Sequence, residues 1–397
     1  MTAVDGADGE KDHLGAEFVK LSLAAWLYLP NLVSDYLGPC EWLYDSRKRS
    51  TRRNEILTEA GALAGRAETA GDAYVAVQSR AIATQIELDI DPTAYGYVEL
   101  VERLLACKFE PPDPSELDEL EREVTGLAVQ LGGGGPDPVR SLESAALIQG
   151  EEKWEAALDA YRAGRRWALA EFPVSFREEL EIARTGDAIT SLHLTWREPD
   201  RMVFEVNVGV PRTRATINYE VAHNIYPGDY LHMAVLSQRT YCEDGRLAAC
   251  IKLKNAPENV IAEGIEETAP FRLQPQPSPD EELSWKLEWL RRGACLTGAI
   301  RRREHGEPRG DVLRHLERTG HMDHDRALQE LSRIEHPLWG TYQYTYWLGR
   351  HLVQESDRRA SAGASSAVYL RWLYGGLHVP ETYLADGDRD LAGTATS

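Results

Sequence analysis

Apolar residues recur three and four positions apart along most of this chain, which is the spacing of an amphipathic α-helix. The spacing predicts helices over residues 56–70, 94–108, 115–131 and 151–170. It predicts further helices over 216–238 and 258–268, and through most of 280–383. A chain with this pattern is expected to bury one apolar stripe of each helix in a helical core.

One region alternates between apolar and polar residues instead, as a half-buried β-strand does. The alternation covers 189–196, a turn of Glu198, Pro199 and Asp200 follows, and a second apolar run covers 202–208. Two such runs joined by a short turn predict a β-hairpin within 188–209. Many helices with one small ribbon predict a mainly α fold.

Breaks in the pattern suggest how the chain is organised. Four consecutive glycines at 132–135, followed by Pro-Asp-Pro, interrupt the helical spacing and predict a boundary. We therefore expect an N-terminal helical part over 15–131 and a C-terminal part over 132–385. The polar ends, 1–14 and 386–397, are predicted to be disordered tails.

The charge of the chain restricts its partners. A formal net charge of -20 argues against nucleic acid and against an anionic membrane surface, because both bind clustered Lys and Arg. The apolar run 21–33 contains Pro30 and is too short to span a bilayer. Five scattered cysteines without a CxxC pair fit a reducing compartment. These features predict a cytoplasmic protein with a small-molecule partner, and they leave its oligomeric state open.

The segment with the clearest chemical content is His-Asn-Ile-Tyr-Pro-Gly-Asp-Tyr at 223–230. In the zinc-peptidase pattern H-E-x-x-H, two His one helical turn apart bind the metal and the Glu between them acts as general base. Here Asn224 follows His223, and Pro227 stands where the second His would be. The pattern alone therefore does not match.

Several segments together resemble a bacterial gluzincin-like, metallopeptidase-related family of unknown function, distantly related to the Taq-type carboxypeptidases. Its signature reads roughly H-E-x-Y-P-G-H-H, followed by a helix with E-G, and is similar to 223–230 and 259–265 here. The segments 35–42, 205–207 and 336–350 extend the resemblance in the same order. It implies a gluzincin helical fold whose short β ribbon edges a deep cleft.

The resemblance also implies roles for single residues. His223 and Glu263 match metal ligands, and Tyr346 matches a residue that stabilises an oxyanion. Arg350 matches a position that binds an acidic substrate group. Asn207, on the strand beside the expected cleft, and Tyr226, in the motif itself, are the remaining candidates for substrate binding.

The departures from the family pattern change the expected chemistry. Asn224 replaces the general-base Glu, and a neutral amide cannot accept a proton near neutral pH. Loss of a general base costs about 10²–10⁴ in rate. Asp229 and Tyr230 replace the two His that end the signature. Regular helix would place positions 223 and 229 roughly 240° apart, but the break at Pro227-Gly228 lets Asp229 turn back towards His223.

The metal could therefore be held by different sets of residues. One set is His223, Asp229 and Glu263, which is rich in carboxylates and favours iron or manganese over zinc. The other is His223, His232 and either Glu263 or Asp229, a two-His-one-carboxylate set like that of non-haem iron enzymes. The alternatives are that Asp229 is a helix N-cap, that His232 is an ordinary buried histidine, and that Glu263 belongs with Glu266 and Glu267 to a solvated acidic face.

These residues predict an altered metalloenzyme that performs non-hydrolytic chemistry on a small, polar, amino-acid-like substrate, as in secondary metabolism. A first alternative is an inactive pseudopeptidase that serves as a binding module. A second is a residual metal-dependent peptidase that uses Glu220 or Glu266 as its base.

Overall fold

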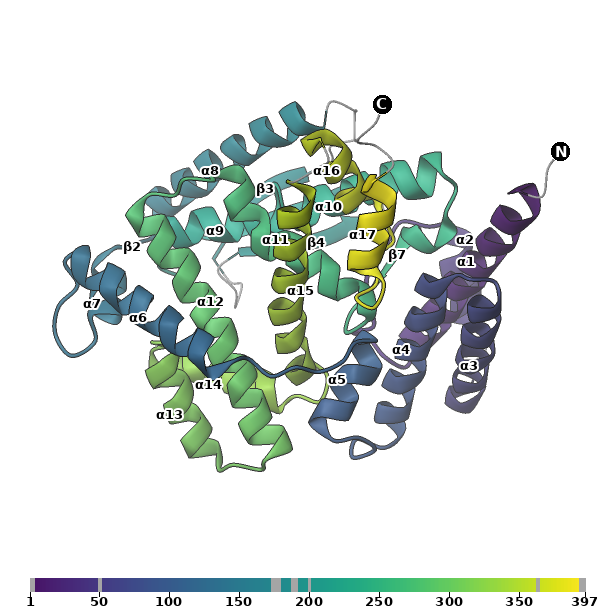
Figure 1. Ribbon diagram of the computed structural model, residues 1–397, viewed down its shortest axis with the longest axis horizontal. Helices are drawn as coiled ribbons and strands as arrows, with labels where there is room; N and C mark the ends of the chain where they lie inside the picture. Colours follow the sequence, from purple (N-terminus) through teal and green to yellow (C-terminus); the bar gives the residue numbers. More distant parts are fainter. Residues whose placement is uncertain are drawn as a thin grey trace. The chain divides into compact units, whose positions relative to one another are not determined.

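The computed structural model describes residues 4–48, 52–172, 180–186, 192–198, 201–361 and 365–392, and it is mainly helical (Figure 1). The predicted mainly α fold class is therefore confirmed. Its strands are short and form three small sheets within the described residues.

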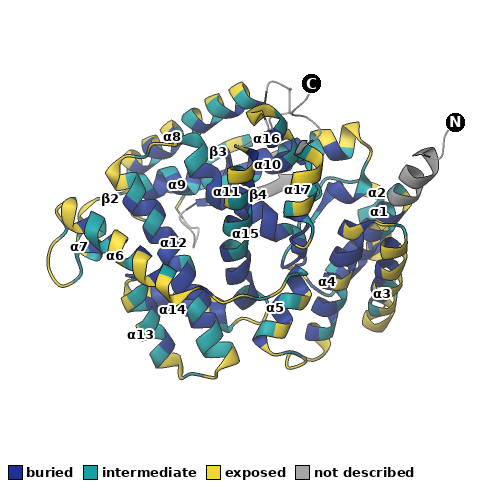
Figure 2. Cartoon of the chain, in the orientation of Figure 1, coloured by how far each residue is buried: buried dark blue, intermediate teal, exposed yellow. Residues whose placement is uncertain are grey.

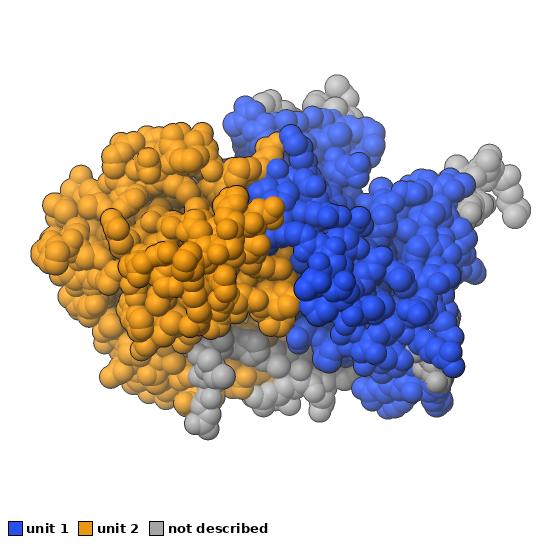
Figure 3. Space-filling view, turned by 90° about the horizontal axis from the view of Figure 1, so that it is seen from below, with its two compact units in different colours: residues 1–109, 232–264, 348–397 blue, residues 110–231, 265–347 orange. Residues whose placement is uncertain are grey.

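The chain forms two compact units, each assembled from separated stretches (Figure 3). Unit 1 contains residues 1–109, 232–264 and 348–397, and unit 2 contains 110–231 and 265–347. The helices α10 (Asp229–Leu236), α11 (Pro257–Leu273) and α15 (Trp339–Ala360) contribute residues to both units. This division differs from the predicted boundary at 132, because the glycine run lies inside unit 2.

Two of the predicted helices, 56–70 and 94–108, are present in unit 1, whereas three further helices before residue 91 were not predicted. Its remaining elements are α1 (Val4–Trp26), β1 (Val33–Tyr36), α2 (Cys40–Lys48), α3 (Arg53–Thr69), α4 (Ala73–Ile90), α5 (Tyr97–Leu105), a π-helix η1 (Ser237–Glu243), a 3-10 helix η2 (Leu247–Cys250), β7 (Ile251–Leu253), α16 (Ser366–Gly375) and α17 (Tyr383–Ala392). Helix α1 runs through most of 1–14, the stretch predicted to be a tail. Helix α17 likewise covers 386–392.

The core of unit 1 brings together residues that are far apart in the sequence. Phe18 of α1 and Ile82 of α4 are fully buried, and Ile251 and Leu253 of β7 lie in the same cluster (Figure 2). Strand β1 pairs antiparallel with β7, with Tyr36 opposite Ile251. The segment around β7 is therefore an integral part of the N-terminal helical core.

Unit 2 contains the second set of helices and the β ribbon. Its remaining elements are α6 (Pro114–Gln130), α7 (Pro138–Ala145), β2 (Leu147–Ile148), α8 (Gly150–Glu171), β3 (Leu180–Thr185), β4 (Leu192–Glu198), β5 (Arg201–Asn207), β6 (Arg212–Thr213), α9 (Arg214–Asn224), α12 (Pro279–Ala299), a π-helix η3 (Ile300–Glu304), α13 (Arg309–Thr319) and α14 (His324–Glu335). Local sequence explains their starts. For example, Asp113 caps α6 by accepting a hydrogen bond from the Ser115 N–H.

The predicted hairpin is confirmed by the antiparallel pairing of β4 with β5, in which Leu192 lies opposite Val206. Residues 189–191 and 199–200 of the predicted hairpin lie outside the described residues. Strand β3 adds to the ribbon in parallel to β5, a pairing that the sequence did not indicate.

The predicted break at Pro227-Gly228 separates two helices. Helix α9 ends at Asn224 and α10 begins at Asp229, and the Gly228 N–H donates to the Ala222 carbonyl over 2.9 Å. A Cβ on Gly228 would lie only 1.7 Å from the His223 carbonyl oxygen. The turn therefore requires glycine, and it fixes where the end of α9 lies.

Candidate metal centre

Helix α9 presents an aromatic pair on one face. Tyr219 and His223 are four residues apart, hence one turn apart, and their rings stack with centroids 6.0 Å apart. Thr213 begins the helix by accepting a hydrogen bond from the Thr216 N–H over 3.0 Å. The His223 side chain is 12% exposed.

Helix α11 presents three carboxylates at helical spacing. Glu263, Glu266 and Glu267 are 7%, 4% and 0% exposed. Because these carboxylates are buried, the alternative that Glu263 belongs to a solvated acidic face is wrong. Buried carboxylates are rare in proteins unless they are paired or bind metals.

Close helix packing beside these carboxylates rests on two glycines. A Cβ on Gly264 of α11 would lie 2.3 Å from the Gly349 carbonyl oxygen of α15, and a Cβ on Gly349 would lie 2.0 Å from the Val260 carbonyl oxygen. Any side chain at either position would force the helix backbones apart. The register of α11 against α15 is thus fixed next to Glu263.

Ligand-type atoms of α9 and α11 converge at one point. His223 Nε2 lies 3.3 Å from Glu266 Oε2. One ligand atom each from His223, Glu263 and Glu266 lie within 4.8 Å of one another. Glu263 precedes Glu266 by one turn of a continuous helix, so α11 itself sets the spacing of these two carboxylates.

One pair of these ligand atoms has the separation that two ligands of one metal ion would have. Zinc binds imidazole nitrogen and carboxylate oxygen at about 2.0–2.2 Å, which places two tetrahedral ligand atoms about 3.3–3.5 Å apart. The separation of His223 Nε2 from Glu266 Oε2 falls in this range. A set of two carboxylates and one imidazole also suits iron or manganese.

A second layer of contacts surrounds Glu267. The Tyr219 hydroxyl donates to Glu267 Oε2 over 2.6 Å, and Arg292 of α12 lies 3.1 Å from Glu267 Oε1. His223 Nδ1 lies 3.7 Å from the same Oε1. Burial alone would lower the pKa of Arg292, but Glu267 beside it raises that pKa well above the usual value. Arg292 therefore stays cationic next to Glu267.

Tyr346, predicted to stabilise an oxyanion, lies in this second layer. The Arg292 guanidinium stands 3.6 Å from the centre of the Tyr346 ring, a cation–π contact. Tyr346 thus reaches His223 through Arg292 and Glu267. Its role with a substrate stays a prediction.

The other two predicted catalytic residues have local partners. The Asn224 side-chain amide donates to the Glu220 carbonyl over 2.7 Å, which ties it to its own helix. The Glu220 carboxylate pairs with Arg212 at 3.3 Å and is 24% exposed. No ligand-type atom of Glu220 belongs to the group formed by His223, Glu263 and Glu266.

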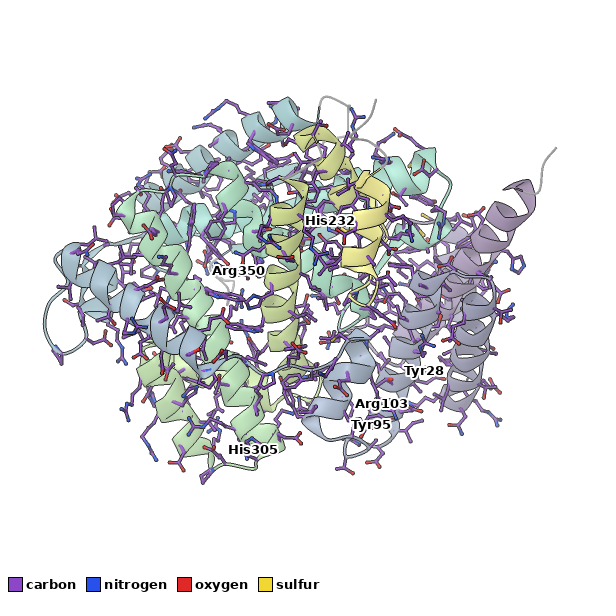
Figure 4. All side chains as sticks on the ribbon, in the orientation of Figure 1. Tyr28, Tyr95, Arg103, His232, His305 and Arg350 are labelled. Atoms are coloured by element: carbon purple, nitrogen blue, oxygen red, sulfur yellow. The ribbon has the colours of Figure 1, made fainter. Side chains whose placement is uncertain are left out.

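Two predicted ligands are not in this group either. Asp229 is the first residue of α10. His232, labelled in Figure 4, is 7% exposed, and its ring meets that of Tyr374 edge-on at 6.2 Å. It lines a small cavity of unit 1. Whether either residue binds metal stays a prediction.

The predicted substrate-binding residues are buried. Asn207 is 2% exposed, and its Oδ1 accepts the Gly209 N–H over 3.0 Å. Tyr226 is fully buried, with its ring edge-on to that of Tyr230 at 5.4 Å. Arg350, labelled on α15 in Figure 4, is 8% exposed. Whether Asn207, Tyr226 or Arg350 binds a substrate stays a prediction.

The sequence pointed to part of this arrangement. It named His223 and Glu263, and it gave Glu266 only as an alternative base. The spacing of Tyr219 with His223, and of Glu263 with Glu267, could have indicated two facing helix surfaces. Nothing in the sequence singled out Arg292.

Comparison with known proteins defines the fold and nothing more specific. No known family profile and no curated protein matches the sequence. The fold is similar to that of a "putative lipoprotein" from Colwellia psychrerythraea, with a TM-score of 0.63 and 11% identity over 91% of this chain and 71% of the other. A second structure so described, of unknown function, from Shewanella oneidensis, has a TM-score of 0.55 and 11% identity over 87% of this chain and 69% of the other.

The predicted membership of a gluzincin-like metallopeptidase family is therefore wrong. Both structural neighbours are described as a "putative lipoprotein" and neither as a peptidase, and no family profile matches the chain. The resemblance rested on short motifs in which Asn224, Asp229 and Tyr230 already departed from the signature. Short motifs of this kind determine local turns and packing, and they are weak evidence for membership of a family.

Among the described residues, no helix combines the length and the apolar character needed to cross a bilayer. The cytoplasmic location stays a prediction.

Proposed function

We propose that this chain is a metal-dependent enzyme that binds a divalent metal ion through His223, Glu263 and Glu266. The observation that carries the proposal is the convergence of three ligand-type atoms within 4.8 Å from two helices. Both carboxylates are buried, so they are shielded from the water that would otherwise compete for them.

The donor set favours a hard or borderline ion. Two carboxylates and one imidazole are ligands of iron, manganese and zinc, whereas soft thiolates are not part of the group. Three protein ligands leave coordination positions for water or a substrate, as catalytic sites do. When bound, the ion would supply Lewis-acid activation of a substrate oxygen.

The reaction we propose is not peptide hydrolysis. The carboxamide of Asn224 has no basic group and donates to the Glu220 carbonyl. The sequence-based expectation of a small, polar, amino-acid-like substrate remains part of this proposal. Arg350 is its candidate partner for an acidic group.

Metal titration tests the proposal. Protein purified without chelator is titrated with zinc, manganese and iron(II) by calorimetry, and its metal content is measured after dialysis. We expect close to one equivalent of one metal for the natural chain. His223→Ala and Glu266→Gln should lower the affinity at least about 100-fold, because each removes a ligand. His324→Ala, at a histidine whose side chain is 64% exposed, is the matched control.

A very low metal content would refute the proposal. If less than about a tenth of an equivalent binds after reconstitution with all three metals, His223 is an ion-pair partner of Glu266 and Glu267 and the metal proposal fails. The chain would then be a candidate binding module. With the family membership overturned, the residual-peptidase alternative has no support.

A further inference from the structure

We infer that Glu267 is a positioning residue, which holds His223 in the tautomer that presents Nε2 to the metal. This inference rests on the proposed function. It assigns a role to the group of Tyr219, Glu267 and Arg292, none of which is a predicted ligand.

The two nitrogens of His223 face different carboxylates. Nε2 lies 3.3 Å from Glu266 Oε2, and Nδ1 lies 3.7 Å from Glu267 Oε1. A neutral imidazole carries its proton on one nitrogen and a lone pair on the other, and a metal binds the lone pair. A metal bound to Nε2 beside Glu266 therefore requires the proton on Nδ1, and Glu267 is the carboxylate placed to hold it there.

Glu267 is placed to accept a hydrogen bond from His223 Nδ1. A carboxylate only accepts hydrogen bonds, so it favours a hydrogen on His223 Nδ1. The distance of 3.7 Å is longer than a hydrogen bond, and a shift of about 0.7 Å would bring the two atoms to the usual separation. Metal-bound histidines commonly donate their second N–H to a carboxylate in this way.

The orientation of Glu267 is itself fixed from two sides. The Tyr219 hydroxyl holds Oε2 at 2.6 Å, and Arg292 holds Oε1 at 3.1 Å. Arg292 itself is held by its cation–π contact with the Tyr346 ring. The carboxylate can therefore not turn away from His223 without losing buried hydrogen bonds, which are costly to leave unmade.

Substitution of Glu267 tests this role. Glu267→Ala should weaken binding of the metal that the natural chain prefers by about 10–100-fold. Glu267→Gln should weaken it less, because the amide oxygen still accepts from Nδ1–H. Glu330→Ala is the matched control, since Glu330 is also a buried carboxylate of unit 2 paired with an arginine, Arg333, at 2.7 Å.

A spectroscopic readout separates positioning from folding. Long-range ¹⁵N–¹H spectra of the zinc-loaded protein report which His223 nitrogen carries the proton. We expect a proton on Nδ1 in the natural chain and a mixture of ring states in Glu267→Ala. Should Glu267→Ala fail to fold, Glu267→Gln with the same spectra decides the question.

Two outcomes overturn the inference. One is equal metal affinity in the natural chain and both Glu267 variants, and the other is a proton on Nε2 in the zinc-loaded natural chain. If the natural chain binds no metal at all, the proposed function itself fails. The two failures are therefore distinguishable.

Discussion

Glu258 shows how burial of a single residue changes its chemistry. It lies in the first turn of α11, accepts a hydrogen bond from the Tyr74 hydroxyl, and accepts another from the Leu253 N–H over 2.6 Å. It also lines a cavity of about 20 Å³ with His232 and His378, which is room for one water molecule. Burial raises the pKa of Glu258 to about 7, although both hydrogen bonds lower it.

This raised pKa predicts that stability depends on pH. The folded state holds the Glu258 proton up to about pH 7, whereas the unfolded chain releases it near its usual pKa. The free energy of unfolding should therefore fall as pH rises from about 4.5 to 7, by up to about 3 kcal/mol, and level off above it. Urea unfolding at pH 5 and pH 8 measures this fall.

The variant Glu258→Gln should remove most of that fall, since it has no proton to lose. Glu119→Gln, at an exposed position of α6, should keep the fall of the natural chain. The same change between pH 5 and pH 8 in all three proteins would refute the assignment to Glu258.

The sequence identified some site residues and missed others for a physical reason. His223 and Glu263 stand out because their side chains bind metals and a motif drew attention to them. Glu267 and Arg292 act through contacts between α9, α11 and α12, which pair residues 25 positions apart or more. Single-chain periodicity does not report such contacts.

At the scale of elements, the junction of α9 and α10 is the most sensitive point of the site. Gly228 has no room for a Cβ, which would clash with the His223 backbone. We expect Gly228→Ala to lower the free energy of unfolding by about 3 kcal/mol or more, because backbone must move. It should also weaken metal binding, since His223 moves with the end of α9. Denaturant unfolding and metal titration measure the two effects.

Gly61→Ala is the matched control for this change. Gly61 lies in the middle of α3, and nothing lies within 4 Å of a Cβ placed there. Alanine at such a helical position should stabilise by about 0.5–1 kcal/mol. Equal effects of the two substitutions would show that the close approach at Gly228 carries no strain.

Part of the helix and strand positions was predictable from the sequence. The spacing of Leu117, Leu120 and Val124 predicted α6, and an alternating run followed by an apolar run predicted β4 and β5. Strand β3 was missed because its parallel partner β5 lies beyond β4 in sequence, and its own residues show only partial burial. Helices α1, α2 and α4 were not predicted, and the first turns of α1 are acidic and polar, which is why they were expected to be a tail.

At the scale of the whole molecule, the sequence could not reveal that unit 1 is assembled from three stretches. The glycine run at 132–135 looked like a boundary, yet Gly133 packs against the Pro138 carbonyl inside unit 2. Local composition marks loops, whereas units are defined by contacts between distant segments. The family assignment was wrong for a similar reason, because it rested on short local motifs and not on contacts between distant segments.

Because unit 1 is assembled from separated stretches, we expect that its N-terminal stretch does not fold alone. A fragment of residues 1–131 lacks Ile251, Leu253 and Val379, which belong to the core of unit 1. It also lacks β7, the partner of β1. We expect the isolated fragment to show no cooperative thermal unfolding by circular dichroism. A sharp transition like that of the full chain would show that the N-terminal helices form an independent domain.

The most direct test of the proposed metal centre is to locate the metal itself. Crystals grown with zinc, manganese or iron(II) are measured on both sides of the absorption edge of the metal. We expect an anomalous peak about 2.0–2.2 Å from His223 Nε2 and from carboxylate oxygens of Glu263 and Glu266. A peak elsewhere, or no peak with His223 bound directly to Glu266 and Glu267, would contradict the proposed centre.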